Sequence, residues 1–385
     1  MSDASTSTLV CKRVQSLHVT EKAVNGFLEI EGILRLRTAL QARAASEGSM
    51  PPKDFISALE VAQRAGVSRS AVSRTFTPGA SVSAETRRKV TDAAEALGYH
   101  VNELARGLMR SHSGIVCLIV SDVATPYRSA LLRELTGKLQ NAGKVAMLIN
   151  TDRSDGSVDR ALSQAIRYRA DASIILSGLP DASIVRLCLR NGQRLVLINR
   201  DDDEPGPLKI NLDDFEAGER IVTAFARAGC KSLAFANSDA GTPSLMGRER
   251  GFVAAATRCG LEVSVERYGW TGYEAGRVLA QRFLTRSRRP DAVFCATDLL
   301  ACGFMDAARH QFGISVPDQM CIAGFDDIEQ ASWLSYGLTT FAQPVAEIAA
   351  KAVGWLSVDD NGNDNGLQSV RLTAELVWRT SIRAA

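Results

Sequence analysis

Short apolar runs alternate with amphipathic segments over most of the chain, and this alternation constrains the fold more than any other feature. Four runs with the length of buried strands come first: IVCLIV from 115, VAMLI from 145, SIILS from 173 and LVLI from 195. The segments between them have helical periodicity, at 127–142, 158–169 and 182–191. This alternation predicts an α/β fold in which helices cover both faces of a parallel sheet.

A second series of the same kind follows. Its strands are expected near Leu233, Val263, Val293 and Cys321, and its helices near Phe215, Arg248, Tyr273 and Leu299. Two such units indicate two lobes with a cleft between them. Because ligands of open α/β sheets bind at the carboxyl ends of strands, the loops that follow these strands should line the cleft.

Ahead of the lobes, the stretch from Ser57 to Phe76 predicts a helix-turn-helix. Ser57 and Glu60 have the spacing of a capping box at a helix start, and Gly66 suits the left-handed residue at its end. The apolar face of this helix is expected to comprise Leu59, Val61, Ala62 and Ala65. Two short helices around a glycine also occur in many all-α domains, so this stretch alone leaves DNA binding open.

The second helix of this pair is expected to begin after Ser68, which suits an N-cap. It should bury Ala71 and Val72 and expose Arg69, Ser70, Ser73 and Arg74. A third helix is predicted within 81–98, capped by Ser83 and ended by Gly98. Its apolar positions are Val90, Ala93, Ala94 and Leu97.

The length of the chain indicates several domains, and its charge is compatible with DNA binding. A chain of 385 residues exceeds what one core usually holds, so two or three domains are expected. The formal net charge is +2. The range 51–112 carries nine basic and six acidic residues, a net charge of +3, which permits DNA binding without proving it.

The pattern of reactive residues gives no support for catalysis. The eight cysteines lie singly, without a C-x-x-C pair, and we expect them to be core thiols of a reducing cytoplasm without a metal site. There is no G-x-S-x-G motif and no phosphate-binding loop, so neither an enzyme nor a cofactor is expected. No apolar run is long enough to span a bilayer and the N-terminus lacks a signal-peptide pattern, so export is not expected.

Several segments together resemble the LacI/GalR family of bacterial transcription regulators, the lac-repressor type. The first are VAQRAGVSRSAVSRTF, VSAETRRKV and LGYHVNELARGLM, similar to the family's headpiece and hinge. The later ones are TPYRSALL at 125, VLINR at 196, MGRERGF at 246, FCATDLLACG at 294, IAGFDD at 322 and LTTFAQP at 338. The resemblance therefore covers the chain from about Phe55 to its end.

The resemblance implies a domain organisation. It consists of a three-helix headpiece over 51–98, a hinge helix within 99–113, and a two-lobed, periplasmic-binding-protein-like core over 114–385 that binds an effector and forms a dimer. Crossovers between the lobes are expected around 338–344. Residues 1–50 precede the family's usual start. We weigh two hypotheses for them: translation begins at Met50, or the segment 21–45 forms a helix that binds a partner.

The resemblance also implies which residues meet DNA. Arg69 and Ser70 stand where base preference varies in the family, and we expect Arg69 to read guanine. Leu108 stands where a minor-groove wedge is expected, although Val101 replaces the usual proline and Gly107 weakens the hinge helix. Ser83 and Thr86 have the alternative of merely capping their helix. The full expected set is Ser57, Ser68, Arg69, Ser70, Ser73, Arg74, Ser83, Thr86, Asn102, Ala105 and Leu108.

For the effector, the resemblance implies a polar set in the cleft. It comprises Tyr127, Asn199, Arg248, Trp270, Thr297 and Asp326. These types suit a polyhydroxylated ligand such as a sugar. Two of them depart from the family, since Asn199 replaces a common Asp and Thr297 a common Asn. Arg248 leaves an acidic or phosphorylated sugar open, and it has the alternative of a surface ion pair, as Trp270 has that of a core residue.

The expected protein is thus a cytoplasmic homodimer that binds a double-stranded, roughly palindromic DNA operator, most often as a repressor, under the control of a small effector. No additional bundle for tetramer formation is expected. The alternative is a sugar-binding protein of a transport system, which shares the two lobes. An enzyme on the same α/β scaffold ranks third.

Overall fold

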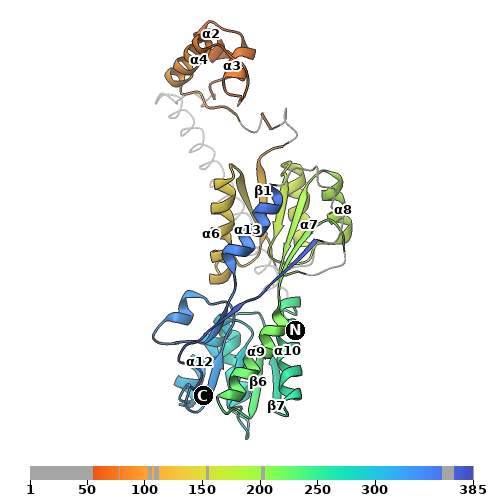
Figure 1. Ribbon diagram of the computed structural model, residues 1–385, viewed down its shortest axis with the longest axis vertical. Helices are drawn as coiled ribbons and strands as arrows, with labels where there is room; N and C mark the ends of the chain where they lie inside the picture. Colours follow the sequence, from red (N-terminus) through yellow and green to blue (C-terminus); the bar gives the residue numbers. More distant parts are fainter. Residues whose placement is uncertain are drawn as a thin grey trace, which may run out of the picture. The chain divides into compact units, whose positions relative to one another are not determined.

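The computed structural model describes residues 55–77, 79–102, 106–107, 112–152, 156–200, 204–357 and 368–384 (Figure 1). The chain divides into two compact units, 1–102 and 103–385. The extension over 1–50 lies outside the described residues, and so do the predicted DNA contacts Ala105 and Leu108. Among the described residues, no helix is both long and apolar enough to cross a membrane.

The first unit contains the three predicted helices, α2 (Ala58–Ala65), α3 (Arg69–Thr75) and α4 (Ala84–Leu97). Ser57 and Glu60 form the capping box, with the backbone N–H of Ser57 donating to Glu60 Oε2 at 2.7 Å. Gly66 ends α2 at a φ of 64°, which a glycine adopts without strain. Its small core consists of Val61, Ala62, Val72, Val90, Ala93 and Ala94.

Two details of this unit differ from the prediction. Leu59 was expected on the buried face of α2 but is 54% exposed. The apolar stripe runs through positions 58, 61, 62 and 65, at the spacing of one helix face, and position 59 lies beside that stripe. Ala71 was expected to be buried and is only half-buried.

The first lobe of the second unit is built on a six-stranded parallel sheet with the order β11-β5-β4-β3-β1-β2. The strands are β1 (Ile115–Val120), β2 (Val145–Asn150), β3 (Ala172–Ile175), β4 (Arg194–Ile198), β5 (Leu208–Leu212) and β11 (Gln368–Leu372). Its helices are α6 (Pro126–Asn141), α7 (Ser157–Arg167), α8 (Ala182–Arg190) and α13 (Val345–Leu356).

Strand β1 shows why the sequence of this lobe reads as continuous apolar runs. Val116, Leu118 and Val120 pack into the cluster that contains the α6 leucines, whereas Cys117 and Ile119 pack with residues of α7 and α8. Both faces of the strand are therefore buried, as predicted from the alternation of strands and helices.

The second lobe has a four-stranded parallel sheet with the order β7-β6-β8-β9. The strands are β6 (Ser232–Asn237), β7 (Glu262–Arg267), β8 (Ala292–Cys295) and β9 (Cys321–Ala323). Its helices are α9 (Asp214–Arg227), α10 (Pro243–Arg258), α11 (Tyr273–Leu284) and α12 (Asp298–Phe312), with the 3-10 turn η1 (Glu329–Ser332) after β9. All four predicted strands and all four predicted helices of this series are present.

Glycines allow the helices of the second lobe to pack in close pairs. A Cβ at Gly251 of α10 would lie 2.0 Å from the carbonyl oxygen of Phe215 on α9. A Cβ at Gly303 of α12 would lie 1.9 Å from the carbonyl oxygen of Tyr273 on α11. Each helix pair therefore needs glycine at its crossing point.

The chain passes between the lobes three times, which differs from the single region predicted around 338–344. It crosses after β5, again between β10 (Thr340–Ala342) and α13, and finally between β11 and β12 (Glu375–Val377). Strands β10 and β12 pair antiparallel to each other. As Figure 1 shows, α13 packs beside α6 in the first lobe. Strand β11 then joins the sheet of this lobe beside β5, so the C-terminal part of the chain completes the first lobe.

The prediction of core thiols is confirmed for six of the seven described cysteines. Cys117, Cys188, Cys230, Cys295, Cys302 and Cys321 are buried. Cys259 is exposed, because it lies just beyond the last turn of α10 at the surface.

Candidate functional site

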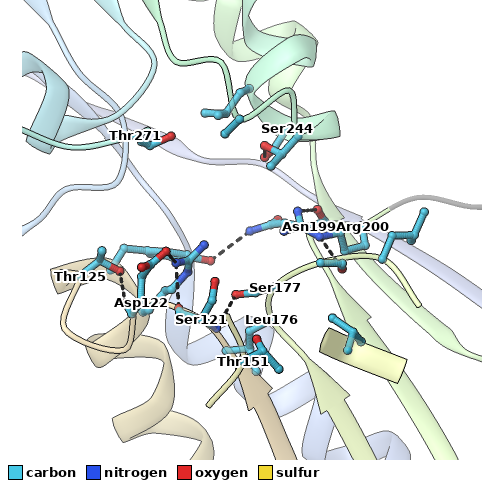
Figure 2. A pocket seen from close by; sticks show the side chains of 18 of the residues that line it. Ser121, Asp122, Thr125, Thr151, Leu176, Ser177, Asn199, Arg200, Ser244 and Thr271 are labelled. Atoms are coloured by element: carbon cyan, nitrogen blue, oxygen red, sulfur yellow. Dashed lines mark hydrogen bonds and ion pairs between the residues drawn. The ribbon is translucent and has the colours of Figure 1, made fainter. Parts of the chain in front are cut away.

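A cavity of about 880 Å³ lies between the two lobes of the second unit. Its walls are the loops at the carboxyl ends of the strands, as predicted: Ser121 follows β1, Thr151 follows β2, Leu176 follows β3, Thr271 follows β7 and Thr297 follows β8. Figure 2 shows Ser121, Thr151 and Leu176 grouped on one side and Thr271 on the other. The cavity has the size of a small-molecule site.

All six residues predicted for the effector line this cavity. Tyr127 lies in the first turn of α6, and its hydroxyl accepts a hydrogen bond from Asn199 Nδ2 at 3.2 Å. Burial raises the pKa of Tyr127, and the Asp326 carboxylate raises it further. The phenol therefore keeps its proton, which is available to a ligand acceptor.

Two of the six have positive φ angles, which non-glycine residues rarely adopt. Asn199 follows β4 at a φ of 55°, and Asp326 follows β9 at a φ of 133°. Each lies where its strand ends at the cavity. Backbone strain of this kind tends to collect at functional sites.

Arg248 has its charge already paired. Its Nε donates to Asp214 Oδ1 at 2.8 Å, and its Nη1 donates to the Ala296 carbonyl oxygen at 2.7 Å. The guanidinium carbon lies 3.4 Å from the centre of the Phe325 ring. Arg248 is 2% exposed, so the alternative of a surface ion pair is wrong. Because Asp214 neutralises it, an anionic ligand gains little at this position.

Two carboxyl groups at the second-lobe side have raised pKa values. Burial raises the pKa of Asp326 to about 6, although Arg248 opposes the effect, and Gln343 Nε2 donates to Asp326 Oδ1 at 2.7 Å. Burial and then Asp326 raise the pKa of Asp298 to about 8. Asp298 accepts from the Thr340 hydroxyl at 2.5 Å and from the backbone N–H of Ile328 at 2.9 Å. Asp298 thus holds the backbone of Ile328, a residue that lines the cavity.

Four buried polar atoms on the cavity wall have no hydrogen-bond partner within the described ranges. They are Thr151 Oγ1, Asn199 Oδ1, Thr297 Oγ1 and Gln343 Oε1. Buried polar atoms are normally hydrogen-bonded, so atoms left without partners indicate where a bound molecule completes the structure. Two of the four are carbonyl oxygens that only accept, and two are hydroxyls that also donate.

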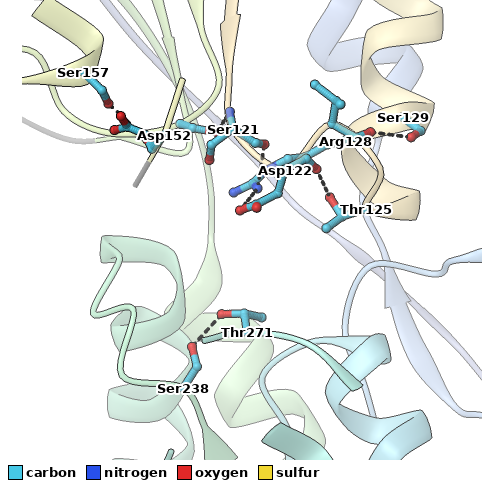
Figure 3. A network of polar contacts seen from close by, with 11 residues as sticks. Ser121, Asp122, Thr125, Arg128, Ser129, Asp152, Ser157, Ser238 and Thr271 are labelled. Atoms are coloured by element: carbon cyan, nitrogen blue, oxygen red, sulfur yellow. Dashed lines mark hydrogen bonds and ion pairs between the residues drawn. The ribbon is translucent and has the colours of Figure 1, made fainter. Parts of the chain in front are cut away.

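Trp270 and Thr271 line the second-lobe side of the cavity, and Ser238 pairs with Thr271. Trp270 follows β7 and is 57% exposed, so the alternative of a core residue is wrong. In Figure 3, Ser238 and Thr271 of the second lobe, whose hydroxyls are 2.6 Å apart, lie opposite Asp122 and Arg128 of the first. Arg128 Nη1 lies 3.1 Å from Asp122 Oδ2.

In the first unit, the start of α3 presents the predicted DNA face. Arg69, Ser70, Ser73 and Arg74 are all exposed. Ser68 Oγ accepts from the backbone N–H of Ala71 at 3.2 Å and lies 2.8 Å from Ser70 Oγ. The short side chain of Ser70 is held by Ser68. Arg69 is the first residue of α3, and its long side chain can reach beyond the helix start.

The other predicted DNA residues that the structure describes are also at the surface of this unit. Ser83 caps α4 by accepting from the backbone N–H of Thr86 at 3.2 Å, and its hydroxyl donates to Thr86 Oγ1 at 2.8 Å. The capping role weighed for this pair is therefore present. Ser57 and Asn102 are exposed.

Two family models match the chain. Residues 59–102 match the model described as bacterial regulatory proteins, lacI family, and residues 222–382 match a periplasmic binding protein-like domain. The chain is 31% identical over 330 residues to the HTH-type transcriptional repressor CytR of Escherichia coli (strain K12), covering 84% of this chain and 96% of that protein. The chain belongs to the LacI family.

Other similarities agree with LacI family membership. The HTH-type transcriptional regulator DegA of Bacillus subtilis (strain 168) is 27% identical, covering 84% of this chain and 96% of DegA. A crystal structure of the lac repressor dimer bound to operator and the anti-inducer ONPF has a TM-score of 0.78 at 23% identity, covering 86% of this chain and all of that one. This last likeness shows the shared fold. As a LacI-family protein, the chain is a transcription regulator with a DNA-binding helix-turn-helix and a ligand-binding core, as the sequence predicted.

Sequence reasoning missed many residues of the cavity wall, and four polar ones matter most here. They are Thr151, Ser177, Arg200 and Gln343. Two of them had a signal, because Arg200 ends the segment VLINR and Gln343 lies in LTTFAQP. Thr151 lies two positions after the run VAMLI, and Ser177 ends the run SIILS, so the rule that ligands bind at strand ends applies to both.

Proposed function

We propose that this LacI-family protein is a cytoplasmic homodimeric repressor whose affinity for its operator is set by a small polar effector in the cavity. The observation that carries the proposal is the cavity wall, where four buried polar atoms lack partners within the described ranges. A wall of this kind is completed by a hydroxyl-rich molecule. The name of the relative CytR, a transcriptional repressor, supports repression.

On the DNA side, the start of α3 enters the major groove and Arg69 bonds to guanine. Phosphates are held by Ser68, Ser73, Arg74, Ser83 and Thr86, which set the register on the duplex. Two-fold symmetry places two such helices on the half-sites of a palindromic operator. Ala105 and Leu108 keep their predicted role at the hinge, where Leu108 is the wedge.

On the effector side, Asn199, Asp326 and Gln343 accept hydrogen bonds from ligand hydroxyls, and Tyr127 donates one. The lobes contribute on both sides of the cavity, so the ligand changes the angle between them. Coupling between two sites is reciprocal, so an inducer lowers operator affinity by the factor by which operator lowers inducer affinity. This role involves no chemical reaction, and we assign no catalytic residue.

The test begins with an operator selected from a random pool of double-stranded DNA by the full chain. Selection should enrich one roughly palindromic sequence, and a panel of sugars, nucleosides and their acidic derivatives should contain compounds that raise the unfolding midpoint. At about a hundred times its dissociation constant, a ligand stabilises the native state by roughly 2.7 kcal/mol. A pool that stays random after selection would contradict the DNA role.

A further inference from the structure

The first-lobe wall of the cavity has a chemistry of its own. The sheet order places β4, β3, β1 and β2 side by side, so the residues that follow them form one row at the edge of the sheet. These residues are Arg200, Ser177, Ser121 and Thr151. All four line the cavity. Figure 2 shows them on the side of the first lobe.

Arg200 is a buried cation without a carboxylate partner among the described residues. It is 7% exposed, and its Nε and Nη1 donate to the carbonyl oxygens of Gly178 and Asn199, each at 2.8 Å. Burial and the neighbouring Arg128 guanidinium lower the pKa of Arg200 to about 10. Arg248 differs, because Asp214 pairs with it. A buried charge without a counter-charge is costly, and an anionic ligand would supply the counter-charge.

Further hydrogen-bond donors lie in the same wall. Ser177 Oγ accepts from the backbone N–H of Ser121 at 3.0 Å, which leaves the hydroxyl proton of Ser177 for another acceptor. Thr151 is 7% exposed, and its hydroxyl has no partner within the described ranges. Both hydroxyls can therefore donate to an oxyanion at the cavity.

The start of α7 adds backbone donors. This helix follows Gly156 and has no side-chain cap, and helix N-termini favour anions. Its residue Val158 lies against the turn that Arg200 holds, since a Cβ at Gly178 would be 2.5 Å from Val158 Cγ2. The helix start and the guanidinium thus belong to the same corner of the cavity.

Carboxylates also line this part of the cavity, and each has a partner of its own. Asp152 lies 3.5 Å from Arg160, and Glu204 lies 2.8 Å from Arg186. Asp159 accepts from the backbone N–H of Asp181 at 3.0 Å, and Asp181 caps α8. The charged group that affects the pKa of Arg200 most is Arg128, and not one of these four carboxylates.

We propose that Arg200, Ser177, Thr151 and the first amides of α7 bind an anionic group of the effector, either a phosphate ester or a carboxylate. The hydroxyl-rich part of the same molecule then lies toward Asn199, Gln343 and Asp326, since the Asp326 carboxylate repels an anion. This inference rests on the proposed function and narrows its ligand class to anionic polyols.

The test uses inorganic phosphate as the probe and the full chain as the protein. Unfolding midpoints are measured in rising phosphate and, at equal ionic strength, in sodium chloride. We expect a saturable increase that is specific to phosphate in the wild type. Arg200→Gln should lower the apparent phosphate affinity about tenfold, the usual worth of a charged hydrogen bond. The matched control Arg258→Gln, an exposed arginine on α10, should match the wild type.

A second variant guards against misfolding of Arg200→Gln. Thr151→Val keeps the shape of a side chain whose hydroxyl has no partner in the described part of the chain, so we expect an intact fold and an affinity lower by about threefold. Equal effects of phosphate and chloride on the wild type would overturn the proposal. Equal phosphate affinity in wild type and both variants would also overturn it and would mean an adventitious ion only.

Two further experiments are needed. One shows whether a phosphate or a carboxylate binds, and the other shows whether the anion site or the proposed function fails. Calorimetric titration with a hexose phosphate and with a hexuronate shows which anionic group binds, and loss of either signal in Arg200→Gln supports the site. If phosphate has no specific effect while a neutral ligand alters operator binding, the anion site is refuted and the proposed function stands. If the selected DNA pool stays random, the proposed function itself fails.

Discussion

Arg248 and Asp214 form a buried ion pair at the boundary of the two lobes, with Nε 2.8 Å from Oδ1 and side-chain exposures of 3% and 10%. Asp214 begins α9 directly after the first crossover, and Arg248 lies on α10 and reaches the Ala296 carbonyl beside β8. The pair therefore joins the crossover to the floor of the cavity. Since its charges satisfy each other, the pair is part of the frame that holds the cavity.

Replacing Arg248 should destabilise the protein strongly. Arg248→Met leaves the Asp214 carboxylate buried without a counter-charge, which should cost about 3–5 kcal/mol in the free energy of unfolding. The control Arg258→Met, on the same helix, removes an exposed pair with Glu219 and should cost less than about 1 kcal/mol. Urea unfolding measures both. Similar small losses in the two variants would show that the buried pair does not hold the frame.

The stability of the protein should depend on pH through Asp326. Its folded-state pKa is raised from 3.8 to about 6 by burial, so the folded protein retains a proton that the unfolded chain loses. Stability from this group is therefore full below about pH 4 and is lost as pH rises to about 6.

The measurement compares wild type with Asp326→Asn by urea unfolding over this pH range. Between about pH 4.5 and 7, the free energy of unfolding of the wild type should fall by on the order of 2 kcal/mol relative to that of the variant, because the asparagine side chain does not titrate. Removing the charge also relieves Asp298, whose pKa Asp326 raises, and this effect has the same sign. Parallel pH curves for the two proteins would rule out the raised pKa.

The helix crossing at Gly251 should tolerate no side chain. Gly251→Ala places a methyl group 2.0 Å from the Phe215 carbonyl oxygen, so α9 and α10 must separate, at a cost of about 3 kcal/mol. Gly354 on α13 is the matched control, because a Cβ there meets nothing within 4 Å. Gly354→Ala should stabilise the protein by about 0.5–1 kcal/mol. Thermal unfolding of the two variants should therefore shift in opposite directions, and a shared direction would contradict the crossing geometry.

Arg69 should determine base preference at one operator position. Arg69→Ala should lose about 1–3 kcal/mol of discrimination there, while binding to random DNA weakens less. Arg88→Ala, which removes an exposed arginine of α4, is the control and should leave base preference unchanged. Competition binding against operators with single base changes gives the discrimination directly. An unchanged preference in Arg69→Ala would remove this residue from the readout.

In the first lobe, the sequence predicted the strands whose apolar runs are uninterrupted. Strand β5 was missed because Lys209 and Asn211 interrupt its run, although the strand is buried throughout. Lys209 is fully buried because its amine donates to the Glu204 carbonyl oxygen at 2.9 Å. A buried lysine of this kind depends on a partner brought by the fold, which a single sequence does not reveal.

The six predicted effector residues line one cavity, because each lies near the end of a strand or the start of a helix in the predicted alternation of strands and helices. Asp298 and Arg200 were missed for a physical reason. The environment of Asp298 includes Thr340, and that of Arg200 includes Arg128, neighbours that are 42 and 72 positions away along the chain. Two of the three crossovers were also missed, and only the one between β10 and α13 lies in the region predicted around 338–344.

The most direct test of the central claim is the operator affinity of the full chain with and without a ligand that raises its unfolding midpoint. The account predicts that such a ligand changes the operator dissociation constant by about 5–150-fold, and that operator changes the ligand dissociation constant by the same factor. A ligand that binds in the cavity but leaves the operator dissociation constant unchanged would contradict the account.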